Sequence, residues 1–166
     1  MRWKPVAAGL AGIAAVAALA AWAQGGAPDA RGAGPGRADL SVLGMPVTEA
    51  MLRDGAQIYA ENCAACHGAR LEGQPDWRRR GDDGRMPAPP HDDTGHSWHH
   101  ADRDLFAITK LGVGAVVPGY DSDMPAFGDL LTDDEIRAVL AFIKSRWSDR
   151  AREAQARINA ARGDEP

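Results

Sequence analysis

Cysteine is scarce in this 166-residue sequence, and positive charge is outweighed by negative charge. Cys63 and Cys66 are the only cysteines, so a zinc site of the finger type, which needs a second pair of ligands at a similar spacing, is not indicated. The 19 Lys and Arg residues face 23 Asp and Glu residues, which gives a formal net charge of −4. An acidic chain of this kind is not expected to bind nucleic acid.

The two cysteines lie in the stretch Cys63-Ala64-Ala65-Cys66-His67, which has the Cys-x-x-Cys-His pattern that attaches c-type haem. Two thiols three positions apart can each add to a vinyl group on one porphyrin edge, and the next residue then places an imidazole under the iron. We therefore predict that Cys63 and Cys66 are thioether anchors and that His67 is the proximal iron ligand. A thioredoxin-type motif would need a βαβ setting, and a structural disulfide would leave His67 without a role.

The first 23 residues have the pattern of a signal peptide. Arg2 and Lys4 precede an uncharged run over residues 6–23, and Ala21-Trp22-Ala23 has the small-x-small pattern of a cleavage site. The run is rich in alanine and only weakly hydrophobic, which favours cleavage after Ala23 over an uncleaved membrane anchor. In both cases we expect a periplasmic domain, or one anchored to the outer face of the cytoplasmic membrane.

Residues 24–45 are rich in Gly, Ala, Pro, Arg and Asp without periodicity, so we expect a flexible linker there. A helix is predicted to follow, with Thr48 as its N-cap. One face of this helix has helical spacing and comprises Leu52, Gly55, Ala56 and Tyr59. A glycine inside a helix costs about 1 kcal/mol relative to alanine, and we interpret Gly55 as a point where another helix approaches closely.

A long loop is predicted over residues 70–97, because proline and glycine are frequent and no helical or strand period is visible. A proximal histidine generally donates its second ring N–H to an acceptor. We expect a backbone carbonyl of Ala88-Pro89-Pro90 to accept this hydrogen bond from His67. Trp98 is expected to pack at the haem edge and to donate its indole N–H to a propionate; an ordinary core tryptophan is the alternative.

Four histidines lie close together near the end of this loop: His91, His96, His99 and His100. Such a density of imidazoles permits a second metal, such as copper or zinc. The alternative is that these side chains only form hydrogen bonds with haem propionates or water. We favour this alternative, because the segment is a polar loop.

Two Met-Pro pairs, Met86-Pro87 and Met124-Pro125, offer a second axial ligand for the iron. Proline biases the preceding residue towards extended backbone, so either methionine can be held in a fixed orientation. Position favours Met124, because the chain can return there over the opposite haem face; a histidine from 91–100 is a third candidate. A thioether ligand favours Fe(II) and raises the reduction potential.

Two further helices are predicted in the second half of the chain. A short one is expected from 101 or 102 to Leu111, with Gly112 as its C-cap. A longer one follows the capping box Thr132-Asp133-Asp134-Glu135, and its apolar stripe is Ile136, Val139, Leu140, Ile143 and Trp147. We expect this last helix to cross the face that contains Gly55. Residues 149–166 lose the stripe, so we predict a charged helical or frayed tail that extends the helix and is exposed or covers a partner.

The pentad, the stretch Met124-Pro125-Ala126-Phe127-Gly128 and the capped last helix together resemble class I c-type cytochromes, particularly bacterial monohaem ones, over residues 46–148. The resemblance implies an all-α fold, the small cytochrome c fold, in which the N- and C-terminal helices cross next to one covalently bound haem c. It also implies His67 and Met124 as axial ligands and electron transfer as the activity. The segment from Pro90 to His100 is similar to a subgroup of these proteins.

On these grounds we expect an electron carrier, not an enzyme, that exchanges single electrons with a donor and an acceptor redox protein. A membrane is expected as a partner only if the N-terminal segment is uncleaved. Two alternatives stay open at this point. One is a haem enzyme or gas sensor in which Met124 is labile, and the other is a copper-handling protein that uses His91, His96, His99 and His100.

Overall fold

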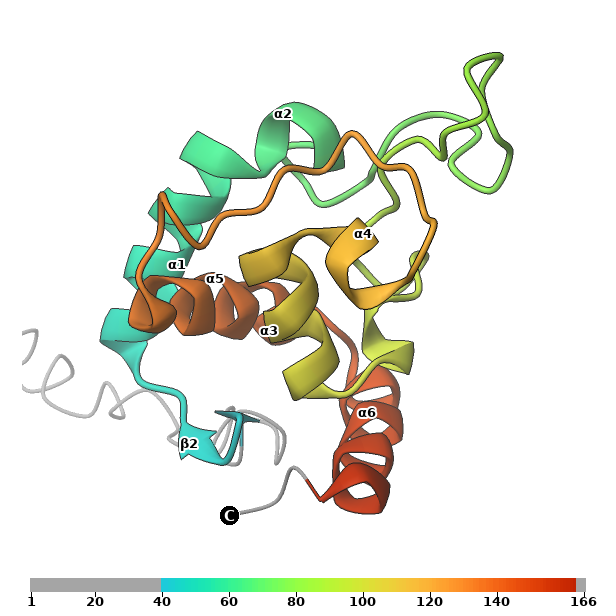
Figure 1. Ribbon diagram of the computed structural model, residues 1–166. Helices are drawn as coiled ribbons and strands as arrows, with labels where there is room; N and C mark the ends of the chain where they lie inside the picture. The colour runs from blue at the N-terminus through green and yellow to red at the C-terminus, as the bar shows by residue number, and fades with distance from the viewer. Residues whose placement is uncertain (1–39, 164–166) are drawn as a thin grey trace, which may run out of the picture. The chain divides into compact units, whose positions relative to one another are not determined.

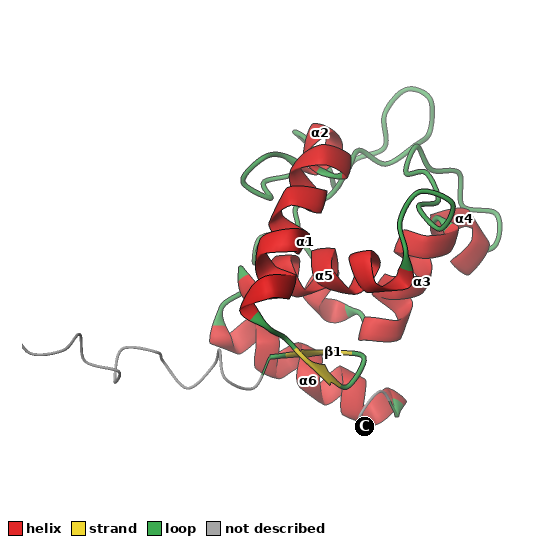
Figure 2. Ribbon diagram, turned by 90° about the vertical axis from the view of Figure 1, so that its left-hand side faces the viewer, coloured by secondary structure: helices red, strands yellow, loops and turns green. Residues whose placement is uncertain are grey.

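The computed structural model describes residues 40–163, and helices dominate this part of the chain (Figures 1 and 2). The predicted signal peptide (1–23) and linker residues 24–39 lie outside the described residues. A single two-stranded antiparallel pair is the whole sheet structure among residues 40–163, so the predicted all-α class is confirmed. The elements in chain order are β1 (Ser41–Val42), β2 (Met45–Pro46), α1 (Glu49–Asn62), α2 (Ala64–His67), the 3-10 helix η2 (Ser97–His99), α3 (Asp102–Leu111), α4 (Val113–Val116), α5 (Asp133–Ser145) and α6 (Asp149–Arg162).

Helices α1 and α5 cross in contact with each other, as predicted (Figure 1). The contact is closest at Gly55, where a Cβ atom would lie 2.0 Å from the carbonyl oxygen of Ala138 and 3.0 Å from Cβ of Phe142. No side chain fits at that separation, so the helices can meet this closely only because residue 55 is glycine. The interpretation of Gly55 from the sequence is therefore confirmed.

Both helices begin at the predicted caps. Thr48 Oγ1 accepts a hydrogen bond from the backbone N–H of Met51 at 3.2 Å. At the start of α5, Thr132 Oγ1 accepts from the backbone N–H of Glu135 at 3.3 Å, and Glu135 Oε2 accepts from that of Thr132 at 2.8 Å. These bonds satisfy N–H groups that have no partner inside the helix.

The hydrophobic core lies between these two helices and the segments that cover them. The apolar stripe of α5 is buried, and Trp147 beyond its end is 2% exposed. Tyr59 from α1, Phe127 from the segment before α5, and Val42 from β1 join the same cluster. Helix α3 packs against α5 and ends at Gly112, whose positive φ of 81° provides the predicted C-cap.

The hairpin of β1 and β2 corrects the predicted boundary of the linker, because residues 40–45 belong to the folded domain. Leu40 and Val42 are buried, and Leu43 and Gly44 both have positive φ (51° and 75°), as a two-residue type I′ turn requires. The alternation Leu40-Ser41-Val42 before a Leu-Gly turn is the short strand signal that the compositional argument overlooked.

The C-terminal segment is helical, one form of the predicted charged helical or frayed tail, but it does not continue α5. Helix α5 ends at Ser145, and a separate helix, α6, follows. Ser148 is its N-cap, because its side chain accepts from the backbone N–H of Ala151 at 3.3 Å. Ala151, Gln155 and Asn159 form its buried face at a spacing of four residues. This face contains two amides, so the sequence shows no apolar stripe although the helix packs.

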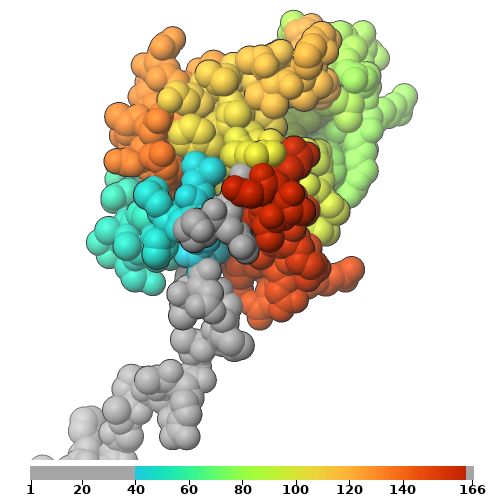
Figure 3. All heavy atoms as spheres, turned by 60° about the horizontal axis from the view of Figure 1, so that its bottom comes forward, coloured from blue at the N-terminus to red at the C-terminus, as the bar shows by residue number. Residues whose placement is uncertain are grey.

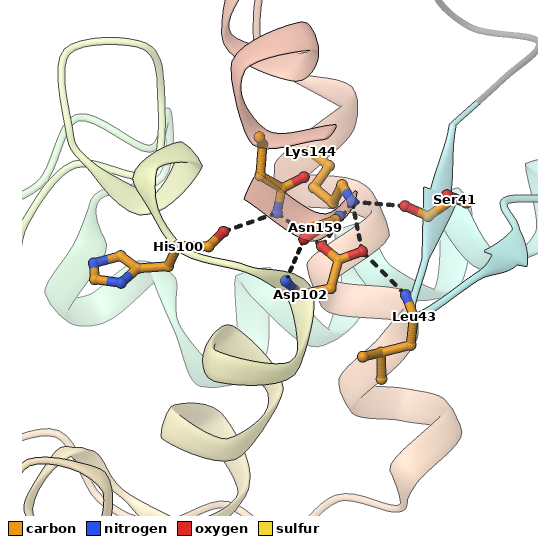
Figure 4. Close-up of polar contacts among 7 residues, drawn as sticks. Ser41, Leu43, His100, Asp102, Lys144 and Asn159 are labelled. Atoms are coloured by element: carbon orange, nitrogen blue, oxygen red, sulfur yellow. Dashed lines mark hydrogen bonds and ion pairs between the residues drawn. The ribbon is translucent and has the colours of Figure 1, made fainter. Parts of the chain in front are cut away.

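The N-terminal hairpin and α6 reach the same face of the molecule (Figure 3). A buried cluster of polar side chains explains why they are held in place (Figure 4). Asp102, at the start of α3, forms an ion pair with Lys144 of α5 at 2.7 Å, and it accepts from Gln155 Nε2 at 2.8 Å and from the backbone N–H of Leu43 at 3.0 Å. Lys144 donates to the carbonyl of Ser41 at 2.6 Å, and Asn159 accepts from the backbone N–H of Asp102 at 2.9 Å. The cluster thus connects the hairpin, α3, α5 and α6.

No helix within residues 40–163 combines the length and the apolar character needed to cross a membrane.

Candidate haem-binding site

The Cys-x-x-Cys-His motif lies directly at the end of α1. Cys63 is both the C-cap of α1 and the N-cap of α2. Its carbonyl accepts from the backbone N–H groups of Cys66 (3.2 Å) and His67 (2.9 Å). Gly68 ends this turn with a φ of 82°. The two thiols and the imidazole are therefore carried on one helical turn, and neither cysteine forms a disulfide.

The ring of His67 is oriented by the loop that follows. Its Nδ1 lies 2.8 Å from the carbonyl oxygen of Pro89, which confirms the expected acceptor in residues 88–90. A carbonyl oxygen can only accept, so Nδ1 carries the proton and Nε2 has a free lone pair. The backbone N–H of Gly73 donates to the carbonyl of His67 at 2.7 Å, and that of Gln74 donates to Ala88 at 2.9 Å, so the two arms of the loop run together beside the ring.

The electrostatics of the motif suit a covalently attached porphyrin. Burial lowers the pKa of His67, partly offset by its hydrogen bond to Pro89, so the imidazole is neutral and able to ligate a metal. Burial, with a smaller contribution from Cys66, raises the pKa of Cys63 to about 11. This setting disfavours a thiolate, and a thioether carries no charge. The donor set therefore fits a haem that Cys63 and Cys66 would hold through thioethers, with Nε2 of His67 available to ligate its iron.

Tyr59 braces the motif from α1, a role that the sequence analysis did not assign. Its hydroxyl lies 3.0 Å from the carbonyl oxygen of Gly68, to which it donates, and its ring packs against Phe142 at 5.4 Å between centroids. Burial is the main cause that raises the pKa of Tyr59 well above its usual range. The signal was available: Tyr59 lies on the buried face of α1, two turns before His67.

The structure gives no support to the alternative of a second metal at the four histidines of residues 91–100. Among residues 40–163, no group of three or more His, Cys, Asp or Glu side chains is placed to hold a metal ion. His91 instead stacks on His67, with ring centroids 3.8 Å apart and planes 17° apart. The ring centroid of His99 lies 3.6 Å from that of Trp98. The ring of His96 stacks on Trp77 with centroids 5.6 Å apart, and its centroid lies 5.3 Å from that of His100. Three of the four histidine rings thus lie against aromatic rings outside the group: His67, Trp98 and Trp77.

The two candidate methionines differ in their surroundings. Met124 is partly buried and packs against the hydrophobic core. Its segment is fixed on the C-terminal side, because the backbone N–H groups of Phe127 and Gly128 donate to the carbonyls of Thr109 and Lys110 at 3.0 and 2.9 Å. Met86 lies in the long loop and does not belong to the set of residues packed on the core.

Trp98 lies on η2, partly buried against the core. Its indole Nε1 donates a long hydrogen bond of 3.4 Å to the carbonyl of Asp93. A bond of that length is weak. The expected donation from Trp98 to a haem propionate stays a prediction.

Comparisons with known proteins agree with this geometry. The family described as "Cytochrome c" matches residues 52–147. The chain is 30% identical over 107 residues to a cbb3-type cytochrome c oxidase subunit CcoP of Rhodobacter capsulatus, an alignment that covers 64% of this chain and 33% of that protein. It is 27% identical over 93 residues to the cbb3-type cytochrome c oxidase subunit FixP of Sinorhizobium medicae, covering 55% of this chain and 28% of FixP.

The match spans about a third of the length of these curated relatives. No solved structure matches the chain. The family match includes the whole motif from Cys63 to His67 and both crossing helices from residue 52 onward. The spacing of Cys63 and Cys66 in this setting indicates covalently bound haem c. The chain belongs to the cytochrome c family.

Proposed function

We propose that this protein carries single electrons between redox proteins, with His67 and Met124 as the axial ligands of its haem. One observation carries the proposal: the hydrogen bond between His67 Nδ1 and the Pro89 carbonyl leaves Nε2 as the free donor atom beside the two cysteines. Membership of the cytochrome c family supports a role in electron transfer. Haem, when bound, supplies a one-electron couple at its iron.

The residues around His67 set the properties of this ligand. The Pro89 carbonyl makes Nε2 more basic by accepting from Nδ1, as acceptors around metal-bound histidines generally do. The ring of His67 is stacked on that of His91, and the residue is only 7% exposed, so little water reaches it. A dry, neutral and oriented imidazole favours a defined reduction potential.

Met124 is the second axial ligand in this proposal, on the haem face opposite His67. The partial burial of Met124 against the core and its anchored C-terminal neighbours support it over Met86. If both axial positions are occupied by side chains of this chain, no substrate can reach the iron. We therefore infer that the protein is an electron carrier and not an enzyme.

We also propose an exported protein that meets its redox partners outside the cytoplasm. The support is the signal-like pattern of residues 1–23, which lie outside the described residues. The relatives are named as subunits of cbb3-type cytochrome c oxidases, and we propose a component of a respiratory chain as the class of partner. The mass of the purified protein distinguishes cleavage after Ala23 from a retained anchor.

The axial ligation is tested by the visible spectrum of the haem-loaded protein. We expect the oxidised protein to show the weak sulfur–iron charge-transfer band and Met124→Ala to abolish it. Met86→Ala is the matched control, because it removes the other methionine that precedes a proline, and it should keep the band. A band that survives Met124→Ala and disappears in Met86→Ala would reverse the assignment.

Carbon monoxide tests the alternative of a gas sensor or haem enzyme. With Met124 bound, we expect the reduced protein at neutral pH to show no spectral change under carbon monoxide. The Met124→Ala variant should bind the gas, which provides the positive control. Stoichiometric binding by the unaltered protein would favour the sensor or enzyme.

A further inference from the structure

An exposed cluster of charged side chains joins the long loop to the segment that contains Met124. Arg85 Nε donates to Asp121 Oδ2 at 3.0 Å, and a second guanidinium nitrogen, NH1, donates to Asp123 Oδ1 at 2.6 Å. The two carboxylates lie three residues and one residue before Met124, while Arg85 lies 36 residues before Asp121. We call Arg85, Asp121 and Asp123 the exposed cluster.

Arg85 itself is held in a defined turn. Its carbonyl accepts from the backbone N–H of Gly81 at 2.9 Å, and its own N–H donates to Asp83 Oδ1 at 3.0 Å. Gly84 has a φ of 80°, which the turn requires and which few other residues adopt. The guanidinium therefore reaches Asp121 and Asp123 from a fixed position, not from a freely moving loop.

A second contact connects the same loop with the same segment. The guanidinium of Arg80 lies over the ring of Tyr120, 5.6 Å from its centroid, and donates to the carbonyl of Gly84 at 2.6 Å. Both Arg80 and Arg85 thus reach residues 120–123. On the other side of Met124, Phe127 and Gly128 are bonded to α3. Met124 is therefore anchored from both directions, once by backbone bonds and once by arginine side chains.

We propose that Arg85 is a positioning residue that keeps Met124 in place by holding Asp121 and Asp123. The proposal rests on Met124 being an axial ligand, as proposed above. The fork of the guanidinium is essential to it, because two different nitrogens engage two different carboxylates, which an ammonium cannot reproduce in the same geometry. The hydrogen bond and charge of Asp121, followed by the charge of Asp123, raise the pKa of Arg85, so its charge is permanent.

The effect should be local and sensitive to salt. The side chains of Arg85, Asp121 and Asp123 are 39%, 71% and 67% exposed, so water and ions screen them. Exposed pairs contribute little each, which corresponds to a change of roughly 2- to 5-fold in an opening equilibrium. We therefore expect Arg85 to govern how often Met124 moves away from its position, not whether the protein folds.

The experiment measures how fast added imidazole displaces Met124 in the oxidised, haem-loaded protein, followed by loss of the charge-transfer band. At low ionic strength we expect Arg85→Gln to accelerate displacement about 2- to 5-fold. Arg85→Lys should bring the rate only part of the way back to that of the unaltered protein. Arg70→Gln is the matched control, because it removes a positive charge from the same loop. Arg70 is paired with Glu72 at 3.8 Å, so its loss should leave the rate unchanged.

The pair of substitutions Asp121→Asn and Asp123→Asn separates positioning from simple charge. It changes the net charge in the opposite direction to Arg85→Gln, so through-space electrostatics predicts opposite effects. Positioning predicts that Arg85→Gln and the double aspartate variant accelerate displacement equally, and that combining all three changes gives no further acceleration. It also predicts that the difference in rate from the unaltered protein disappears in high salt.

Two results would overturn the proposal in distinguishable ways. If the unaltered protein lacks the charge-transfer band, Met124 is not the ligand, and both the proposed function and the role of Arg85 fail. If the band is present and disappears in Met124→Ala, but Arg85→Gln exchanges ligands at the rate of Arg70→Gln, the ligation stands and only the role of Arg85 is refuted.

Discussion

Two ionic clusters lie in different parts of this molecule and have nearly opposite surroundings. The buried cluster around Asp102 and Lys144 has side chains only 1% and 5% exposed, and it connects the hairpin, α3, α5 and α6 (Figure 4). The exposed cluster of Arg85, Asp121 and Asp123 connects two loops near the proposed axial ligand. The distances within the two clusters are similar, between 2.6 and 3.0 Å. Distance alone therefore says little about what each cluster does.

The difference follows from the cost of removing one partner. A carboxylate left buried without its cation cannot recover its hydration, so breaking a buried pair is strongly destabilising. An exposed guanidinium or carboxylate that loses its partner is simply solvated by water. We infer that the buried cluster determines whether the domain stays folded, whereas the exposed cluster affects only how the Met124 segment moves.

The comparison is tested most strongly by Lys144→Met. This change leaves Asp102 buried without its cation, beside the neutral donors Gln155 and the N–H of Leu43, and removes the bond to the carbonyl of Ser41. We expect the free energy of unfolding to fall by about 3–5 kcal/mol, measured by denaturant titration of the haem-loaded protein.

Lys110→Met is the matched control for this change. Lys110 forms an equally short pair with Asp133, at 2.6 Å, but the two side chains are 36% and 47% exposed. The expected loss is below about 1 kcal/mol. Equal losses in the two variants would show that burial does not separate the two kinds of pair. Lys144→Met should also leave the displacement of Met124 by imidazole unchanged, because Asp102 and Ser41, to which Lys144 is bonded, belong to the buried cluster and not to the exposed one.

The second prediction concerns Gly55, which lies in the same helical part of the molecule as the buried cluster. Alanine would gain about 1 kcal/mol of helix propensity, yet its Cβ would lie 2.0 Å from the carbonyl oxygen of Ala138. The helices must separate, and we expect a net destabilisation of roughly 1–3 kcal/mol, measured in the same titration. Ala60→Gly, at an exposed position of α1, measures the propensity effect alone and should cost about 1 kcal/mol. A stabilised Gly55→Ala variant would contradict the close contact.

The helical part of the fold was the most predictable from the sequence, and the reasons are local. Thr48, the box Thr132 to Glu135 and the apolar stripe of α5 act through neighbours within one or two turns, so their spacing along the chain is the physical determinant itself. Gly55 was predictable because its helix penalty needs a compensation. The Pro89 acceptor was predictable because His67 needs a partner for Nδ1 and the following proline stretch provides carbonyls.

What the sequence analysis missed depends on contacts distant in the chain. Asp102 and Lys144 are 42 residues apart, and Arg85 and Asp121 are 36 apart, so no spacing rule pairs them. Helix α6 packs through Gln155 and Asn159, and polar residues on a packed face look like a solvated tail. For the histidines at 91–100 the sequence left a metal site open as an alternative to hydrogen bonding, and neither anticipates their stacking against His67, Trp77 and Trp98, which depends on loop geometry that a composition argument cannot supply.

The smallest predicted effect concerns Tyr59, which connects the helical part to the haem-binding motif. Tyr59→Phe removes the hydroxyl that donates to the Gly68 carbonyl, so we expect a loss of about 1 kcal/mol at pH 7. Burial raises the pKa of Tyr59, so the native hydroxyl keeps its proton at a pH where the unfolded one, with a pKa of about 10, has lost it.

The sign of the pH dependence follows from this difference in pKa. The contribution of Tyr59 to stability is fully present below about pH 10 and is lost as the pH rises further, because deprotonation then favours the unfolded state. Unfolding titrations at pH 7 and pH 11 should therefore show a gap between the unaltered protein and Tyr59→Phe that narrows at the higher pH. Tyr120→Phe, which keeps the ring beneath Arg80, is the control and should change the free energy at pH 7 by less than about 0.5 kcal/mol. A difference in unfolding free energy that stays constant from pH 7 to pH 11 would mean that the hydroxyl of Tyr59 is not shielded from ionisation. The contact that braces the motif would then behave like the exposed cluster and not like the buried one.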